Sequence, residues 1–146
     1  MKQKINAFEI VIDGLRNSLS SITDFETKPS DTSWSKKEIL GHLIDSAINN
    51  LQRFTEIQYV EKPYIIRPYN QNELVKANNY QDKEVADLLN LLTALNKHIL
   101  YVVSNQTEQI LHYQIVLPNK TVTDLQFVIE DYFEHFYHHL HQITRK

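Results

Sequence analysis

Four of the seven histidines fall within seven residues near the end of the chain, in the segment 131–143 (DYFEHFYHHLHQI). The apolar residues between them recur at the spacing of a helix rather than that of a strand. On a helix, His135 and His139 lie one turn apart and project from the same face. Two imidazoles in this relation can hold one metal ion, as in the helical zinc motif HExxH. Phe136 stands where that motif has its glutamate, and a third ligand must come from elsewhere in the chain.

Helical phase separates these four histidines. At about 100° per residue, His139 falls inside the apolar arc of its segment, and His135 falls on the edge of that arc. His138 and His141 fall on the opposite, wetter side. The phase therefore selects His135 and His139 as the candidate ligands and excludes their two neighbours.

An earlier helical segment carries a polar stripe that can complete the site. This segment begins at a capping box formed by Ser35 and Glu38, which satisfies two backbone donors at the helix start. Along one side of this segment, at the edge of its apolar face, lies a row of polar residues: His42, Ser46, Asn49 and Arg53. Burying such a stripe costs free energy unless its members are paired, bind an ion or line a wet cavity. His42 is the best candidate for the third ligand.

Simpler interpretations of the same residues stay open at this point. A histidine at the edge of an apolar face is usually a boundary residue, and His98 has such a position on its own helical segment. His112 has no informative context. Ser46 has the right spacing to contact His42, but no acidic orienter or oxyanion hole accompanies the pair, which argues against a serine nucleophile. The aromatic residues of segment 131–143 fit a core better than a surface for stacking on bases.

Helical periodicity also predicts the fold. The segments of roughly 20 residues that carry it are 2–24, 35–58, 82–104 and 121–144. Residues 59–80 form a long connection, because Pro63 and Pro68 prevent a continuous helix there, although a short helix is expected at about 70–78. Residues 111–117 are expected to be extended. We predict an all-α, four-helix bundle with a long connection between helices two and three, in a single domain over 1–146.

Composition excludes several functional classes. Two glycines cannot build the phosphate-binding loops of Rossmann or P-loop proteins. The chain has no cysteine, so any thiol chemistry requires a thiol supplied by the substrate. A net charge of −3 without basic clusters argues against nucleic acid as a partner. No window reaches the roughly 18 apolar residues of a membrane span, and the first residues do not have the pattern of a signal peptide, so a cytoplasmic protein is expected.

Several motifs resemble those of one known family. Residues 34–46 (WSKKEILGHLIDS), with Asn49 and Arg53 after them, closely resemble the second helix of the DinB/YfiT-like family. The later segments 68–71 (PYNQ) and 131–143 are similar to that family in the same order. The resemblance covers nearly the whole chain.

The resemblance implies a four-helix bundle that binds a divalent metal, zinc or nickel, through three histidines. Carried over by motif, these ligands are His42, His135 and His139, the residues that helical phase selects. Histidine ligands usually need an acceptor for their second nitrogen, and a substrate needs positioning groups. The candidates for these two roles are Asp45, Asn49, Arg53 and Asp131.

The family's activities lead to three functional hypotheses. Some relatives are thiol transferases, which predicts an enzyme that joins a low-molecular-weight thiol such as bacillithiol to a small electrophile. Others are described as metal-dependent hydrolases, in which metal hydroxide attacks an ester or amide. The missing glutamate after His135 makes hydrolysis the second hypothesis. The third is a non-catalytic helical stress or interaction module with a structural metal site. Apolar positions on the first and third helical segments are compatible with a homodimer.

Overall fold

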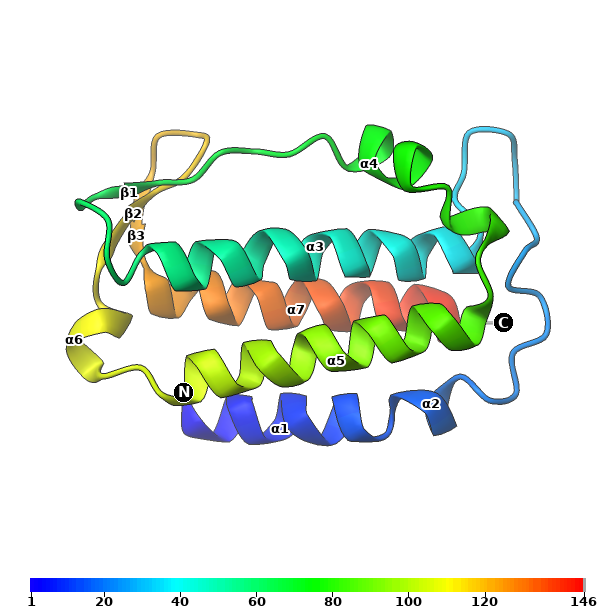
Figure 1. Cartoon of the computed structure of the whole chain (residues 1–146), viewed down its shortest axis with the longest axis horizontal. Helices are drawn as coiled ribbons and strands as arrows, with labels where there is room; N and C mark the ends of the chain where they lie inside the picture. Colours follow the sequence, from blue (N-terminus) through cyan, green and yellow to red (C-terminus); the bar gives the residue numbers. More distant parts are fainter. Residues whose placement is uncertain (146) are drawn as a thin grey trace.

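The computed structural model describes residues 1–145, and four long helices dominate them (Figure 1). They are α1 (Lys2–Asp13), α3 (Lys36–Glu56), α5 (Val85–Ser104) and α7 (Leu125–Thr144). Helix α3 packs against both α5 and α7, and α1 packs against α5. The four helices run side by side along the longest axis of the molecule. The predicted four-helix bundle is confirmed.

The first helix is shorter than the predicted segment 2–24. Helix α1 stops at Asp13, and a short helix, α2 (Leu15–Ser18), follows after Gly14. Glycine is a poor helix former because it loses much backbone freedom on ordering. Two serine hydroxyls then donate to nearby carbonyl oxygens, Ser18 to Gly14 and Ser20 to Asn17, and such bonds compete with a continuing helix. The apolar spacing continues past Gly14, but the backbone does not follow it.

Helix α3 begins where the sequence predicts. The Ser35 hydroxyl accepts a hydrogen bond from the Glu38 backbone N–H at 3.1 Å, and the Glu38 carboxylate accepts one from the Ser35 N–H at 3.1 Å. The capping box is therefore complete. The helix ends at Glu56, close to the expected end near residue 58.

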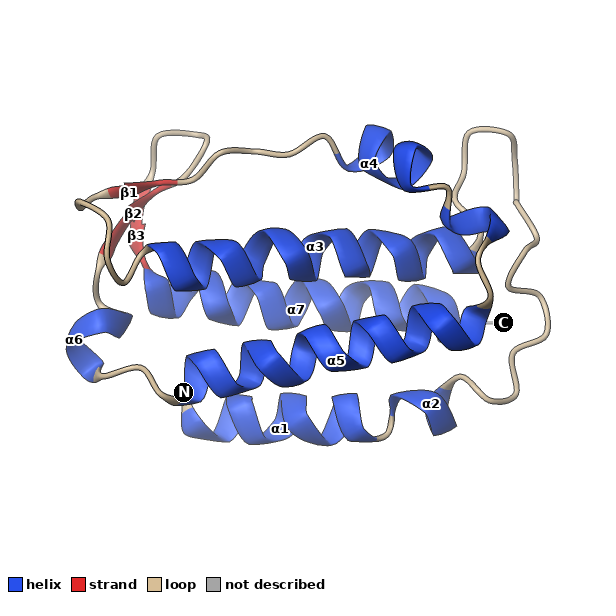
Figure 2. Ribbon diagram, in the orientation of Figure 1, coloured by secondary structure: helices blue, strands red, loops and turns tan. Residues whose placement is uncertain are grey.

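A small three-stranded sheet closes one end of the bundle (Figure 2). Its strands are β1 (Tyr64–Ile65), β2 (Gln114–Val116) and β3 (Val122–Asp124), with β1 parallel and β3 antiparallel to β2. The extended piece expected at 111–117 is thus confirmed in β2, while a helical turn, α6 (Glu108–Leu111), precedes it. The predicted start of the last helix at residue 121 is wrong. Asp124 caps α7 by accepting from the Phe127 N–H, and the residues before it pair as β3.

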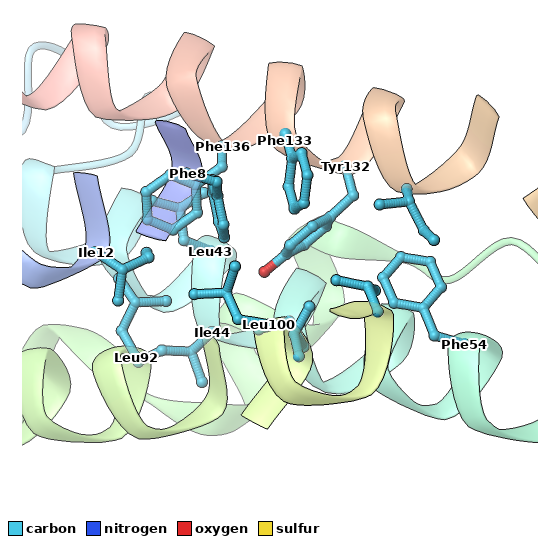
Figure 3. Packing of buried hydrophobic residues seen from close by; sticks show 14 of the residues in the cluster. Phe8, Ile12, Leu43, Ile44, Phe54, Leu92, Leu100, Tyr132, Phe133 and Phe136 are labelled. Carbon is cyan, nitrogen blue, oxygen red and sulfur yellow. The ribbon is translucent and has the colours of Figure 1, made fainter. Parts of the chain in front are cut away.

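Aromatic side chains from α1 and α7 fill the centre of the core (Figure 3). The ring of Phe8 stacks on that of Phe133 with centroids 4.3 Å apart and meets Phe136 edge-on at 5.1 Å. Tyr132 enters the same core and donates its hydroxyl proton to Asn96 of α5 at 2.6 Å. Aromatic pairs in these geometries add to the free energy of burial. This packing fixes the rotation of α7, and with it the direction of the histidines that α7 carries.

The long connection lies along the outside of α3 (Figure 1). We call residues 57–84 the roof segment; it contains β1, helix α4 (Gln71–Asn78) and the 3-10 turn Tyr80–Asp82. Tyr80 is buried against α3 at Gly41, where a Cβ atom would lie 2.0 Å from the Tyr80 ring. Only glycine permits this approach. The roof segment is therefore fixed to the first half of α3.

In the described part of the chain, no helix combines the length and the apolar character needed to cross a membrane.

Candidate metal centre and adjoining cavity

Three histidines from α3 and α7 meet at one point between the two helices. One ring nitrogen each of His42, His135 and His139 lies within 4.8 Å of the other two. The Nε2 atoms of His42 and His135 are 3.1 Å apart although their residues are 93 positions apart in sequence. His42 is fully buried, and the two α7 histidines are half-buried. The structure thus brings together the three histidines that the sequence nominates as metal ligands.

The surroundings keep these imidazoles neutral. Burial, together with the neighbouring His139 and His135, lowers the pKa of His42 to about 3. Burial likewise lowers the pKa of His135 to about 4, with a contribution from His139. Burial also lowers the pKa of His139, against the opposing effect of its hydrogen bond to Gln142. At neutral pH each ring therefore has one nitrogen lone pair, which a metal ion requires of a histidine ligand.

Gln142 orients one of the three rings. Its side-chain oxygen lies 2.8 Å from Nδ1 of His139. A carbonyl oxygen only accepts, so Nδ1 of His139 donates and Nε2 retains the lone pair. Hydrogen bonds of this kind set the tautomer of metal-binding histidines. Sequence reasoning missed this role, although the spacing from His139 to Gln142, three residues on one helix, is a signal for it.

His42 is held from the other side by an aromatic ring. The Trp34 indole lies against the His42 imidazole with ring centroids 4.8 Å apart and a tilt of 34°. Nδ1 of His42 is buried and has no hydrogen-bond partner among the described residues. Nδ1 of His42 therefore lacks a hydrogen-bond partner of the kind that Gln142 provides to Nδ1 of His139.

The remaining histidines lie outside this cluster. His138 and His141 are exposed on the far face of α7, as helical phase predicts. His98 is also exposed, with its ring stacked on that of Tyr101. His112 is exposed and lies 3.1 Å from the Asp124 carboxylate.

A cavity of about 380 Å³ opens beside the three histidines and reaches His135. Its polar lining comes from α3 and α7 and includes Ser46, Arg53 and Asp131. Its apolar lining comes from the roof segment, the β2–β3 turn and α7; these residues are Ile66, Tyr69, Leu117, Pro118, Phe127 and Val128. A ligand in this cavity would have one end at the histidine cluster and an apolar wall along its length.

The predicted positioning residues have different places in the structure. Arg53 and Asp131 line the cavity, Arg53 on α3 and Asp131 one helical turn before His135. Asn49 lines a neighbouring cavity of about 530 Å³ that also touches Arg53, and its amide donates to the Asp45 carbonyl oxygen at 2.8 Å.

Asp45 is buried beneath the roof segment instead. Its Oδ1 atom accepts hydrogen bonds from the Tyr80 hydroxyl at 2.6 Å and from the Asn78 amide at 3.0 Å. Burial raises the pKa of the Asp45 carboxyl, while these two bonds lower it. Asp45 thus joins the roof segment to α3, on the helix that carries His42.

The sequence matches a known family over nearly its full length. A family model described as the DinB superfamily matches residues 7–143. The chain is 25% identical over 143 residues to the "Putative metal-dependent hydrolase YfiT" of Bacillus subtilis, covering 96% of this chain and 80% of that protein. It is also 25% identical over 115 residues to the "Putative metal-dependent hydrolase BH0277" of Halalkalibacterium halodurans, covering 79% of this chain and 66% of that protein.

Solved structures show the same fold. The structure of YfiT from Bacillus subtilis, described as an unusual four-helix bundle, superposes with a TM-score of 0.86 at 24% identity, over 98% of this chain and 83% of that one. A mycothiol-dependent maleylpyruvate isomerase superposes with a TM-score of 0.70 at 12% identity, over 95% of this chain and 58% of that one.

Proposed function

Since the chain belongs to the DinB superfamily, we propose that His42, His135 and His139 hold one divalent ion, zinc or nickel, in a metal-dependent enzyme. The observation that carries this proposal is the convergence of three ring nitrogens within 4.8 Å. Zinc binds imidazole at about 2.0–2.1 Å, which puts neighbouring ligand nitrogens of a tetrahedral site about 3.4 Å apart. The 3.1 Å separation of His42 and His135 is already close to this value. The neutral state of the three rings also suits a metal site, because a metal ion binds a histidine through an unprotonated nitrogen.

The donor set defines the chemistry that an ion would supply. Three neutral imidazoles cancel none of the ion's charge, and among the described residues no carboxylate joins the cluster. An ion held in this way lowers the pKa of a bound thiol or water, and so makes a nucleophile available near neutral pH. The chain's own contribution is to orient the three rings and to keep bulk water from the buried side of His42.

We propose thiol transfer as the reaction. The sulfur of a low-molecular-weight thiol forms a bond to an electrophilic carbon, the leaving group departs with its electron pair, and the thiol proton passes to solvent. The cavity beside His135 offers room for the two small molecules that such a reaction brings together. The shared fold of a mycothiol-dependent isomerase supports a thiol as cosubstrate. The thiol must be exogenous because the chain has no cysteine.

Hydrolysis is the second candidate, with water in place of the thiol. Two observations favour it: the names of YfiT and BH0277 describe metal-dependent hydrolases, and Asp131 lines the cavity next to His135. A carboxylate in that position can accept a proton from the attacking water. Thiol transfer would need no such base, because an ion held by the three histidines would itself lower the pKa of a thiol.

Metal analysis of protein purified without an affinity tag tests the site first. We expect about one divalent ion per chain in the wild type and none in the His135→Ala/His139→Ala variant. The matched control is His98→Ala/His141→Ala, which removes two exposed histidines outside the cluster and keeps the ion. A wild type that stays metal-free after reloading with zinc or nickel would contradict both enzymatic hypotheses.

Two assays on the loaded protein then separate the reactions. Thiol transfer predicts metal-dependent consumption of a thiol with chlorodinitrobenzene, whereas hydrolysis predicts release of nitrophenol from a nitrophenyl ester without any thiol. A protein that binds metal, catalyses neither reaction and loses stability in His42→Ala would instead be the helical module with a structural metal.

A further inference from the structure

Arg53 is a half-buried cation at the side of the cavity that lies away from the histidines. Its guanidinium donates to the Arg67 carbonyl oxygen at 2.7 Å and to the Asn50 side-chain oxygen at 3.5 Å. It also lies over the Tyr69 ring, 5.4 Å from the centroid. All three partners are neutral. They fix the position of the guanidinium without balancing its charge.

No carboxylate within the described chain pairs with Arg53. Among residues 1–145, no ion pair involves this guanidinium, and the side chains that act on its pKa are the tyrosines Tyr69 and Tyr64 rather than acids. Burial lowers the pKa of Arg53 from its usual value, which shows that its charge is partly withdrawn from water. A buried charge without a partner costs free energy, and a ligand anion would offset that cost.

The distance along α3 sets the length of such a ligand. Arg53 follows His42 by 11 positions, so about 16 Å of helix axis separates their Cα atoms. Side chains on a helix lean toward its N-terminus, which brings the guanidinium closer to the histidines than that figure. One wall between the two ends is apolar, with Ile66 and Val128 among its residues. Helix α3 itself adds the polar side chains of Ser46 and Asn50 to the lining.

Asp131 makes the two ends of the cavity differ in charge. It is the acidic residue of the lining and lies about 6 Å of helix axis before His135. An anion placed close to the histidines would therefore meet Asp131, whereas an anion at the far end would meet Arg53. The cavity thus favours a negative group only at a distance from the reacting atom.

Building on the proposed metal-dependent function, we propose that the cavity binds an elongated substrate that carries a carboxylate or a similar anion at the end remote from its reacting atom. Arg53 receives the anion, the apolar wall contacts the middle of the molecule, and the reacting atom lies at His42, His135 and His139. Arg53 is then the residue that determines specificity for charged substrates.

Mercaptocarboxylates of increasing chain length, from mercaptopropionate to mercaptoundecanoate, test this arrangement against the mercaptoalcohols of equal length. Binding to the cobalt-loaded protein is followed by the absorption of the cobalt–sulfur bond. For the long probes we expect the carboxylate to bind about tenfold more tightly than the alcohol, and for the shortest we expect no preference. Arg53→Gln removes the preference, and Arg53→Lys retains part of it. Arg16→Gln, which removes an exposed arginine of α2, leaves the preference unchanged.

The results distinguish a failure of this proposal from a failure of the metal site. Equal affinities for the long carboxylate and the long alcohol, with a normal cobalt–sulfur absorption, would overturn the role of Arg53 alone. Absence of that absorption with every thiol would count against the metal site. In that event, calorimetric titration of the metal-free protein with decanoate and decanol decides the proposal: a preference for decanoate that Arg53→Gln abolishes supports it, and equal binding overturns it.

Discussion

The side-chain oxygen of Gln142 accepts a hydrogen bond from Nδ1 of His139, 2.8 Å away. The amide nitrogen of the same side chain lies 3.3 Å from Nε2 of His138. Gln142 therefore connects an inward-facing histidine with an outward-facing one, and its amide orientation follows from both contacts. Gln142, which does not itself belong to the cluster, thus keeps the lone pair of His139 on Nε2 and fixes the orientation of its ring.

Replacement of Gln142 by alanine is expected to weaken metal binding about 10- to 100-fold, because the His139 ring loses the partner that fixes its tautomer. Competition with a chromophoric chelator measures the affinity. Gln142→Glu retains an acceptor at the same place and keeps most of the affinity. Gln126→Ala is the matched control, since Gln126 lies on the same helix and donates to Glu130 rather than to a histidine. Equal affinities in all of these proteins would show that Gln142 does not orient His139.

Acid is expected to destabilise the metal-free protein through the histidine cluster. The folded-state pKa of His42, about 3, lies below its ordinary value of 6.5. Between these values the unfolded chain binds a proton that the folded chain does not, so the stability contributed by His42 is present above pH 6.5 and is lost as the pH falls. The loss is about 1.4 kcal/mol per pH unit for this one group.

Urea unfolding in the presence of a chelator, between pH 7 and pH 4, measures this dependence. His42→Phe fills a similar volume without titrating, and its stability should fall less steeply with pH than that of the wild type. His141→Asn replaces an exposed histidine and should follow the wild-type curve. Parallel curves for wild type and His42→Phe would contradict the prediction.

Alanine at Gly41 is expected to destabilise the fold by about 1–3 kcal/mol, because a Cβ atom there overpacks the contact with the roof segment. That atom would lie 2.0 Å from the Tyr80 ring. Gly14→Ala is the matched control: its Cβ atom meets nothing closer than the Ile10 carbonyl oxygen at 3.4 Å. This control should be neutral or stabilising by up to about 1 kcal/mol, since alanine favours the helix. Thermal unfolding of both variants decides the comparison, and equal effects would rule out a tight contact at Gly41.

Asp45→Ala is expected to lower stability and to leave metal affinity nearly unchanged. The substitution leaves the Tyr80 hydroxyl and the Asn78 amide without their acceptor, which costs about 1–3 kcal/mol. Chemical unfolding and chelator competition on the same preparation measure the two effects. A variant with normal stability and weakened metal binding would instead assign Asp45 to the orientation of the ligands.

The positions of the histidines were predictable because α3 and α7 are long and regular. Phase on an unbroken helix places His139 inward and His138 outward without knowledge of the partner helix. The first helix shows where this reasoning fails: apolar spacing continues beyond Gly14, but the local cost of glycine and of the serine side chains ends the helix there. The strands of two or three residues were only partly predictable, since such short strands carry almost no periodicity.

The cavity was harder to predict than the histidine cluster. Arg53 lies on the same side of α3 as His42, and the sequence therefore predicts it as a positioning residue. Its neutral partners Arg67 and Tyr69 belong to the roof segment and could not be predicted in this way. The path of that segment depends on the contact of Tyr80 with Gly41, between residues 39 positions apart. Contacts across such separations follow from tertiary packing and leave no local pattern in the sequence.

The two sides of the cavity differ in how freely their sequences can change. The histidines stand on α3 and α7, whose rotation the aromatic core fixes, whereas Ile66, Tyr69, Leu117 and Pro118 belong to connections on the surface. Surface connections accept substitution and insertion far more readily than packed helices. Descendants of one ancestral bundle can therefore change their substrates through these connections while they inherit the reactive centre unaltered.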